Sequence, residues 1–195
     1  MWAELTAARS LIIDQLRGTN AGLSVAFFYF DFQDGEQQTP TAVLSSLLRQ
    51  LVATMPDLPK PISDAYEKHL GSGSLLSLEE LEGLMQGVVK SLHQAIIVID
   101  ALDECDKSRH RRPFLLLLQR LQRISNIRLF VTSRQNFQDI TDVFDEYAQI
   151  TITAHSFDLK CYMRQEMEIA GVAEIVDDTF AKEMIRAVIA KAQGM

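Results

Sequence analysis

The stretch Ala95–Asp106 reads Ala-Ile-Ile-Val-Ile-Asp-Ala-Leu-Asp-Glu-Cys-Asp, and it decides the fold class of this chain. Its leading apolar run, mostly Ile and Val, is typical of a strand buried on both faces in a parallel sheet. Asp100 ends that run, and Asp103 and Glu104 follow at once. We therefore expect these carboxylates at the carboxyl edge of a parallel sheet, where open α/β folds bind their ligands.

The acidic cluster has two interpretations. A buried strand that delivers carboxylates to one sheet edge is how many nucleotide hydrolases hold Mg²⁺ and position a water molecule. An ordinary helix start, with a capping aspartate and acidic residues in the first turn, has the same composition. The stretch by itself favours the nucleotide interpretation and leaves the second one open.

Composition narrows the class of protein. The chain has 195 residues, 47% of them hydrophobic, which suits one domain, or one domain and a fragment of another. The net charge of −7 argues against general binding to nucleic acid or to anionic membranes. No apolar stretch is long enough for a membrane span, and no secretory signal is present. Cys105 and Cys161 lack metal-ligand spacing, which favours a reduced, cytoplasmic setting.

The order of expected elements indicates an α/β fold. The pattern predicts strands over 24–32, 95–100, 127–132 and 149–153. It predicts helices over 3–16, after Thr39-Pro40, around 62–69, after the capping box that begins at Ser77, and over 114–124, 137–147, 157–170 and 178–192. Strands that alternate with helices imply a parallel sheet with crossover helices, followed here by a helical annex.

A second motif, Leu129–Arg134, reads Leu-Phe-Val-Thr-Ser-Arg. If its strand lies beside the acidic strand, Thr132, Ser133 and Arg134 emerge at the same sheet edge. An arginine there can contact a γ-phosphate or offset charge in a transition state. An exposed arginine at the end of a strand is the alternative interpretation.

The two motifs together resemble the NACHT domain of STAND-class P-loop NTPases, which are signal-transduction NTPases with numerous domains. The resemblance is greatest to the fungal branch with nephrocystin-like N-terminal modules. Val25–Phe32, Leu47–Leu51 and the closing segment Ala190–Met195 are also similar to that branch, so the resemblance covers nearly all of the chain. It implies a NACHT nucleotide-binding domain over 1–154 and the beginning of a helical or winged-helix annex over 155–195.

The resemblance also implies roles for individual residues. Asp100 matches the Walker B aspartate that holds Mg²⁺, usually through water. Asp103 and Glu104 match the acidic pair of which one member orients the attacking water, and Arg134 matches the sensor arginine. The family binds Mg²⁺ with ATP or GTP and switches signalling by assembling with copies of itself or with related NACHT proteins. Fungal members are associated with heterokaryon incompatibility and programmed cell death.

The chain departs from the family at its start. No G-x-x-x-x-G-K-[ST] loop occurs in the sequence. Thr6 stands where the Walker A threonine is expected, but Glu4 and Leu5 precede it in place of Gly and Lys, so a solvated threonine at a helix start is the alternative. We therefore expect an incomplete P-loop NTPase-type sheet, without its first strand and phosphate loop.

Two consequences follow from that departure. Nucleotide binding should be impaired, and the incomplete sheet should be unstable alone or require a partner. The function expected is a portion of a NACHT-type signalling NTPase. The alternative is a non-catalytic interaction module that associates with full-length NACHT proteins or modulates them.

Overall fold

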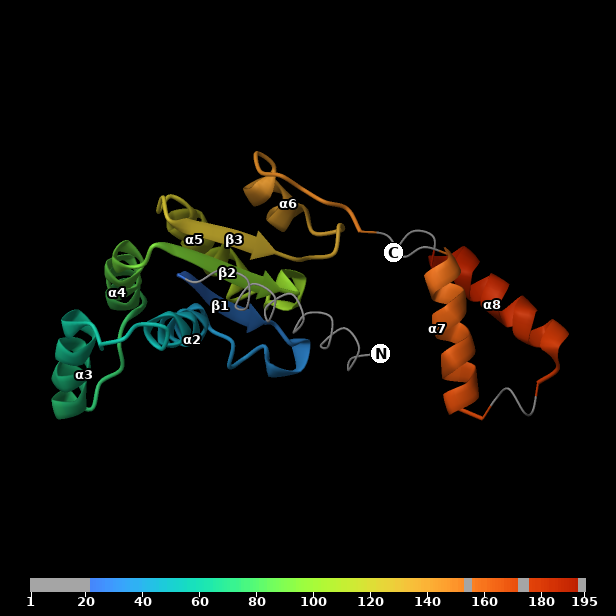
Figure 1. Ribbon diagram of the computed structural model, residues 1–195, viewed down its shortest axis with the longest axis horizontal. Coiled ribbons are helices and arrows are strands. Elements are labelled where there is room, and N and C mark those ends of the chain that lie inside the picture. The colour runs from blue at the N-terminus through green and yellow to red at the C-terminus, as the bar shows by residue number, and fades with distance from the viewer. Residues whose placement is uncertain (1–21, 153–155, 172–175, 193–195) are drawn as a thin grey trace. The chain divides into compact units, whose positions relative to one another are not determined.

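The computed structural model describes residues 22–152, 156–171 and 176–192 (Figure 1). The expected helix over 3–16, with Thr6, lies outside the described residues. The chain divides into two compact units, Met1–Glu146 and Tyr147–Met195. The family resemblance placed the boundary between a nucleotide-binding domain and an annex at 154/155, and this assignment of the two domains stays a prediction.

The first unit is built on a three-stranded parallel sheet, which confirms the α/β class. Its strands are β1 (Leu23–Tyr29), β2 (Gln94–Asp100) and β3 (Ile127–Val131), in the order β1-β2-β3. Tyr29 pairs with Asp100 in β2, and Ile99 pairs with Val131. The acidic strand β2 is therefore central, and its carboxyl end lies between those of its two neighbours.

Helices form where local sequence favours them. The first unit contains α2 (Pro40–Val52), α3 (Lys60–Ser72), α4 (Leu78–Ser91), α5 (Arg111–Gln122) and α6 (Gln138–Phe144). Thr39 caps α2 by accepting the Ala42 N–H at 3.2 Å. The expected capping box of α4 is present, since Ser77 and Glu80 each accept the other's backbone N–H.

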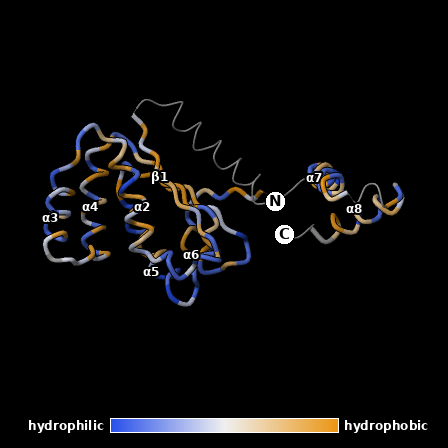
Figure 2. Tube along the Cα trace, turned by 90° about the horizontal axis from the view of Figure 1, so that it is seen from below, coloured by the Kyte–Doolittle hydropathy of each residue, from blue (hydrophilic) through white to orange (hydrophobic). Residues whose placement is uncertain are grey.

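The core of the first unit lies against one face of the sheet. Alternate strand residues such as Ile97 and Ile99 point to that face, as the two-residue period of a strand requires. Figure 2 shows α2, α5 and α6 on one side of the strands, and α4 contacts α2. The largest fully buried side chains are Phe114, Leu44, Leu47, Leu51, Leu81, Met85, Ile97, Ile99, Leu102, Leu117, Leu118 and Leu121.

Two tight segments follow the strands at their carboxyl ends. The short 3₁₀ helix η1 (Phe32–Asp34) follows β1, and η2 (Leu102–Glu104) follows β2. The helix expected over 114–124 begins at Arg111, because a proline such as Pro113 is tolerated in a first helical turn.

The prediction of a strand over 149–153 was wrong for the described residues 149–152, which form no strand. Ile150 and Ile152 are 85% and 87% exposed there. An alternating sequence becomes a strand only when a neighbouring strand accepts its backbone hydrogen bonds, and no strand among the described residues pairs with this segment.

The second unit contains α7 (Ser156–Ile169) and α8 (Asp178–Ala192), as expected from the helix-only pattern of the sequence. Met167, Ile185 and Ile189 form its small buried cluster. Gly171 follows α7 with a left-handed φ of 66°, which is the usual glycine stop of a helix. Within the part of the chain that the structure describes, no helix has the length and apolar character that a membrane crossing requires.

Candidate functional site

The loops after all three strands meet at the carboxyl edge of the sheet. The ladder between β2 and β3 continues past β3, because Thr132 N–H donates to Ile99 O at 2.9 Å and Leu102 N–H donates to Thr132 O at 3.0 Å. Phe30 N–H in turn donates to Asp100 O at 3.0 Å. These bonds place the loop after β2, with its acidic residues, between the loops after β1 and β3.

Asp100 is almost buried, with 5% of its surface exposed. Its Oδ1 accepts a hydrogen bond of 2.5 Å from the Thr132 hydroxyl, and that hydroxyl accepts the Ala101 N–H at 3.0 Å. The threonine therefore orients the carboxylate and the backbone that follows it. The sequence placed Thr132 at this edge, and the structure shows what its hydroxyl contacts.

Ala101 has a left-handed backbone, with φ 54° and ψ 45°. It is the one residue other than glycine with positive φ among the described residues. This conformation costs an L-residue roughly 1–2 kcal/mol. Strain of this kind persists where surrounding contacts determine the backbone, and here it turns the chain sharply so that Asp103 and Glu104 stay at the sheet edge.

Arg134 binds both members of the acidic pair. Its Nε lies 3.3 Å from Asp103 Oδ2 and its Nη2 lies 3.4 Å from Glu104 Oε1, while its backbone N–H donates to Asp103 Oδ1 at 3.2 Å. The Arg134 side chain is 71% exposed, whereas those of Asp103 and Glu104 are 4% and 12% exposed. The guanidinium therefore covers two carboxylates that have little other access to water.

Glu104 also reaches the loop after β1. Its Oε2 accepts the Phe32 N–H at 3.2 Å, so its two oxygens contact loops from two different strands. Asp31 caps the same loop by accepting the Gln33 N–H at 2.8 Å. Glu104 thus links the ends of all three strands.

Arg111 is a residue of this site that sequence reasoning missed. It is 3% exposed, and its guanidinium donates to Cys105 O at 2.7 and 3.1 Å and to Asp103 O at 2.5 Å. The guanidinium also lies over the Phe137 ring, at 4.9 Å from the centroid, and its Nη1 is 3.6 Å from Asp139 Oδ2. Arg111 therefore holds the backbone that carries the acidic pair.

Cys105 is buried in the same loop. Burial raises the pKa of its thiol to about 11, and the opposing effect of the Arg111 charge is smaller. The thiol therefore stays protonated at neutral pH, which does not suit a nucleophile.

These residues fit Mg²⁺ only if a nucleotide and water supply most of its ligands. Among the described residues, no group of three or more His, Cys, Asp or Glu side chains is arranged to hold a metal ion. Mg²⁺ in nucleotide sites takes one or two carboxylates and completes its shell with phosphate oxygens and water. Asp100 is a carboxylate of the kind required, and its Oδ1 also accepts the Thr132 hydroxyl. The oxygens of Asp103 and Glu104 accept bonds from Arg134 and Phe32.

Comparison with known families identifies the family of this chain. The family model described as "Nephrocystin 3, N-terminal" matches residues 6–134, a segment that contains all three strands and ends at Arg134. No match to the chain was found among curated proteins. The matched segment is more than half of the sequence, and the chain belongs to the nephrocystin 3 N-terminal family.

Proposed function

We propose that this chain is a portion of a NACHT-type NTPase switch of the STAND class, of the fungal branch. The observation that supports this proposal is that the carboxylates after β2 contact the residues after β3. Asp100 accepts the Thr132 hydroxyl, and Asp103 and Glu104 pair with Arg134. Asp100 would hold Mg²⁺, Asp103 or Glu104 would orient water, and Arg134 would contact the terminal phosphate of ATP or GTP.

We expect the charge at this edge to weaken nucleotide binding by this chain. This edge carries the three carboxylates of Asp100, Asp103 and Glu104 and the one guanidinium of Arg134, and the excess negative charge repels a polyphosphate. The sequence contains no glycine-rich Gly-Lys-Ser/Thr loop to offset that repulsion. Each charge-assisted phosphate contact that is missing removes roughly 1.5–3 kcal/mol of binding free energy.

Calorimetric titration with MgATP tests this proposal. We expect no specific heat of binding for the wild-type chain or for Asp100→Ala. Tight binding that Asp100→Ala abolishes would contradict the impairment. The DNA upstream of the first codon supplies the second arm, because an in-frame glycine-rich Gly-Lys-Thr segment supports the NTPase switch and its absence contradicts it.

The alternative function is a non-catalytic module that associates with full-length NACHT proteins. It is favoured by the bonds that already occupy Asp103 and Glu104, since these acids then act as ties between loops. In that case the purified chain should bind a full-length relative without nucleotide, and Asp100→Ala should bind equally well. Binding that requires MgATP would contradict this alternative.

A further inference from the structure

The outer edge of β1, which is the edge away from β2, bonds to a side chain at a position where a further strand could pair. In the described sheet β1 has β2 on one side only. The edge strand of a sheet presents backbone N–H and C=O groups that can pair with a strand of another chain. Natural proteins therefore cover or block such edges.

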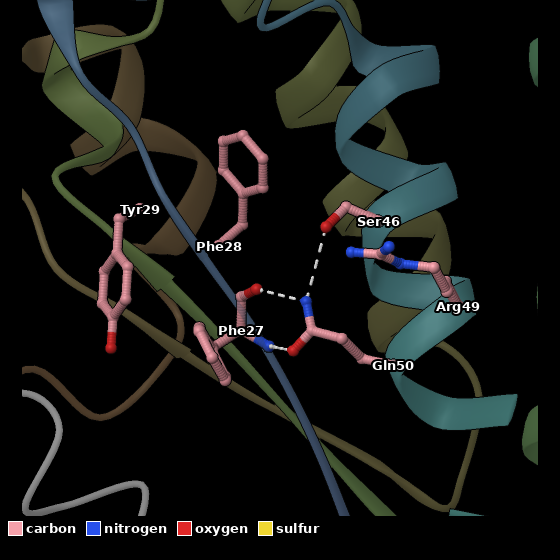
Figure 3. A pocket seen from close by; sticks show the side chains of 6 residues that line it. All are labelled: Phe27, Phe28, Tyr29, Ser46, Arg49 and Gln50. Atoms are coloured by element: carbon pink, nitrogen blue, oxygen red, sulfur yellow. Dashed lines mark hydrogen bonds between the residues drawn. The ribbon is translucent and has the colours of Figure 1, made fainter. Parts of the chain in front are cut away.

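Gln50 of α2 makes both hydrogen bonds that one residue of a neighbouring strand would make (Figure 3). Its Oε1 accepts the Phe27 N–H at 3.0 Å, and its Nε2 donates to Phe27 O at 2.8 Å. Directly opposite residues of antiparallel strands exchange the same two bonds. The Gln50 amide therefore occupies the hydrogen-bonding position of a strand beside Phe27.

The position of this amide is set by α2. Leu47 and Leu51, on either side of Gln50 in sequence, are fully buried and fix the helix against the core. After the end of α2, the Thr54 hydroxyl forms a 2.9 Å hydrogen bond with the Ser24 hydroxyl, which ties the same segment to β1 a second time. Gln50 is thereby presented to the strand edge by a rigid element.

The surface between α2 and the outer edge of β1 is partly open. An open surface depression of about 400 Å³ lies beside β1 and α2. Its lining residues are Phe27, Phe28, Tyr29, Ser46, Arg49 and Gln50. On this side of β1, the backbone N–H and C=O of Phe27 both bond to the Gln50 amide.

We propose that Gln50 seals the outer edge of β1 against pairing with β1 of a second copy of this chain. A second copy is the partner that fits, because two identical strand edges can pair antiparallel about a two-fold axis with the same residues on both sides. This inference concerns the sheet edge away from the carboxylates and does not depend on the proposed nucleotide function.

The test compares Gln50→Leu with the wild type, since leucine keeps the approximate size of the side chain and removes both bonds. Amide hydrogen exchange by NMR should be roughly tenfold faster at Phe27 and unchanged at Phe28, whose N–H points toward β2. Light scattering over a range of concentrations should show more self-association than the wild type. Ser46→Ala is the matched control, because it removes only a 3.4 Å contact to Gln50.

Gln50→Glu is a second variant, which tests whether the bond to the Phe27 N–H and a charge at the edge are enough to prevent self-association. Glutamate keeps an acceptor for the Phe27 N–H, removes the donor to Phe27 O and places a charge at the edge, so the Phe27 N–H should stay protected and self-association should not rise. Unchanged Phe27 exchange in Gln50→Leu would overturn the proposal. Faster exchange at Phe27 without increased self-association would also overturn it, as would equal changes in Ser46→Ala.

Discussion

Arg134 shows how single residues hold the carboxyl edge together. An exposed ion pair usually contributes about 0–1 kcal/mol. Here, however, the partners Asp103 and Glu104 are nearly buried, so loss of the guanidinium would leave two carboxylates poorly solvated. The two sequence motifs were enough to predict that Arg134 and these acids share an edge. Their pairing depends on side-chain geometry that no motif encodes.

Arg111 had no signal in the sequence. An arginine beside Arg112, at the start of a leucine-rich segment, is typical of a solvated helix end. Its burial becomes favourable only because the carbonyl groups of Asp103 and Cys105 accept its N–H groups. The turn at Ala101 brings those carbonyls to Arg111, and the sequence did not predict this turn either.

Replacement of Arg111 by lysine should lower the free energy of unfolding by about 2–4 kcal/mol, because an ammonium cannot reproduce the planar set of bonds to two carbonyls. Urea unfolding measures this change. Arg112→Lys, at the exposed neighbouring position, is the control and should stay within about 0.5 kcal/mol of the wild type. Equal effects of the two substitutions would contradict the positioning role of Arg111.

Cys105 and Cys161 should differ in reactivity. Cys161 is exposed, whereas burial raises the pKa of Cys105 from 9.0 to about 11. A thiol reagent at neutral pH should therefore label Cys161 first and reach Cys105 only on unfolding, as mass spectrometry of digests would show.

The same raised pKa of Cys105 predicts a pH dependence. The folded state favours the protonated thiol, so its contribution to stability is complete below pH 9 and is lost as the pH rises from 9 toward about 11. Cys105→Ala should lack this loss. In the labelling experiment, equal modification of Cys105 and Cys161 in the folded protein would contradict the burial of Cys105.

At the scale of elements, local chemistry was sufficient wherever it acts within one segment. The Thr39 cap with Pro40 and the capping box at Ser77 each depend on a few neighbouring residues, and both were predicted. The segment 149–152 failed for the opposite reason. Strand formation depends on a distant partner, which an alternating pattern does not reveal.

Glu80 makes the start of α4 sensitive to acid. Hydrogen bonds from Lys68, Ser77 and His69 lower its pKa from 4.5 to about 2. Because the folded state favours the carboxylate, its contribution is present above pH 4.5 and is lost as the pH falls toward 2. Glu80→Gln should therefore be less stable than the wild type at neutral pH and equally stable near pH 2.

Thermal unfolding at a series of pH values measures this difference for Glu80. Glu79→Gln is the matched control, since Glu79 lies in the same first turn and is exposed. It should show no convergence with the wild type over the same pH range. A constant difference between Glu80→Gln and wild type at every pH would refute the titration of Glu80.

At the scale of the whole molecule, the alternation of strands and helices predicted a parallel sheet followed by a helical segment. The structure confirms the parallel sheet and contains α7 and α8 after it. The order β1-β2-β3 and the register of Tyr29 with Asp100 follow from long-range packing. That register is what brings the loop after β1 to Glu104, so the geometry of the site required the fold as well as the motifs.

The most direct test of the central claim, that the carboxyl edge of the sheet is a metal–nucleotide edge, is paramagnetic line broadening by Mn²⁺, a probe for Mg²⁺ sites that detects weak binding. We predict that NMR signals of residues 100–104 and 132–134 broaden first, and that Asp100→Asn removes this selectivity while Asp106→Asn, at a solvated turn, does not. Broadening that is absent from this edge, or that is unchanged in Asp100→Asn, would contradict the account.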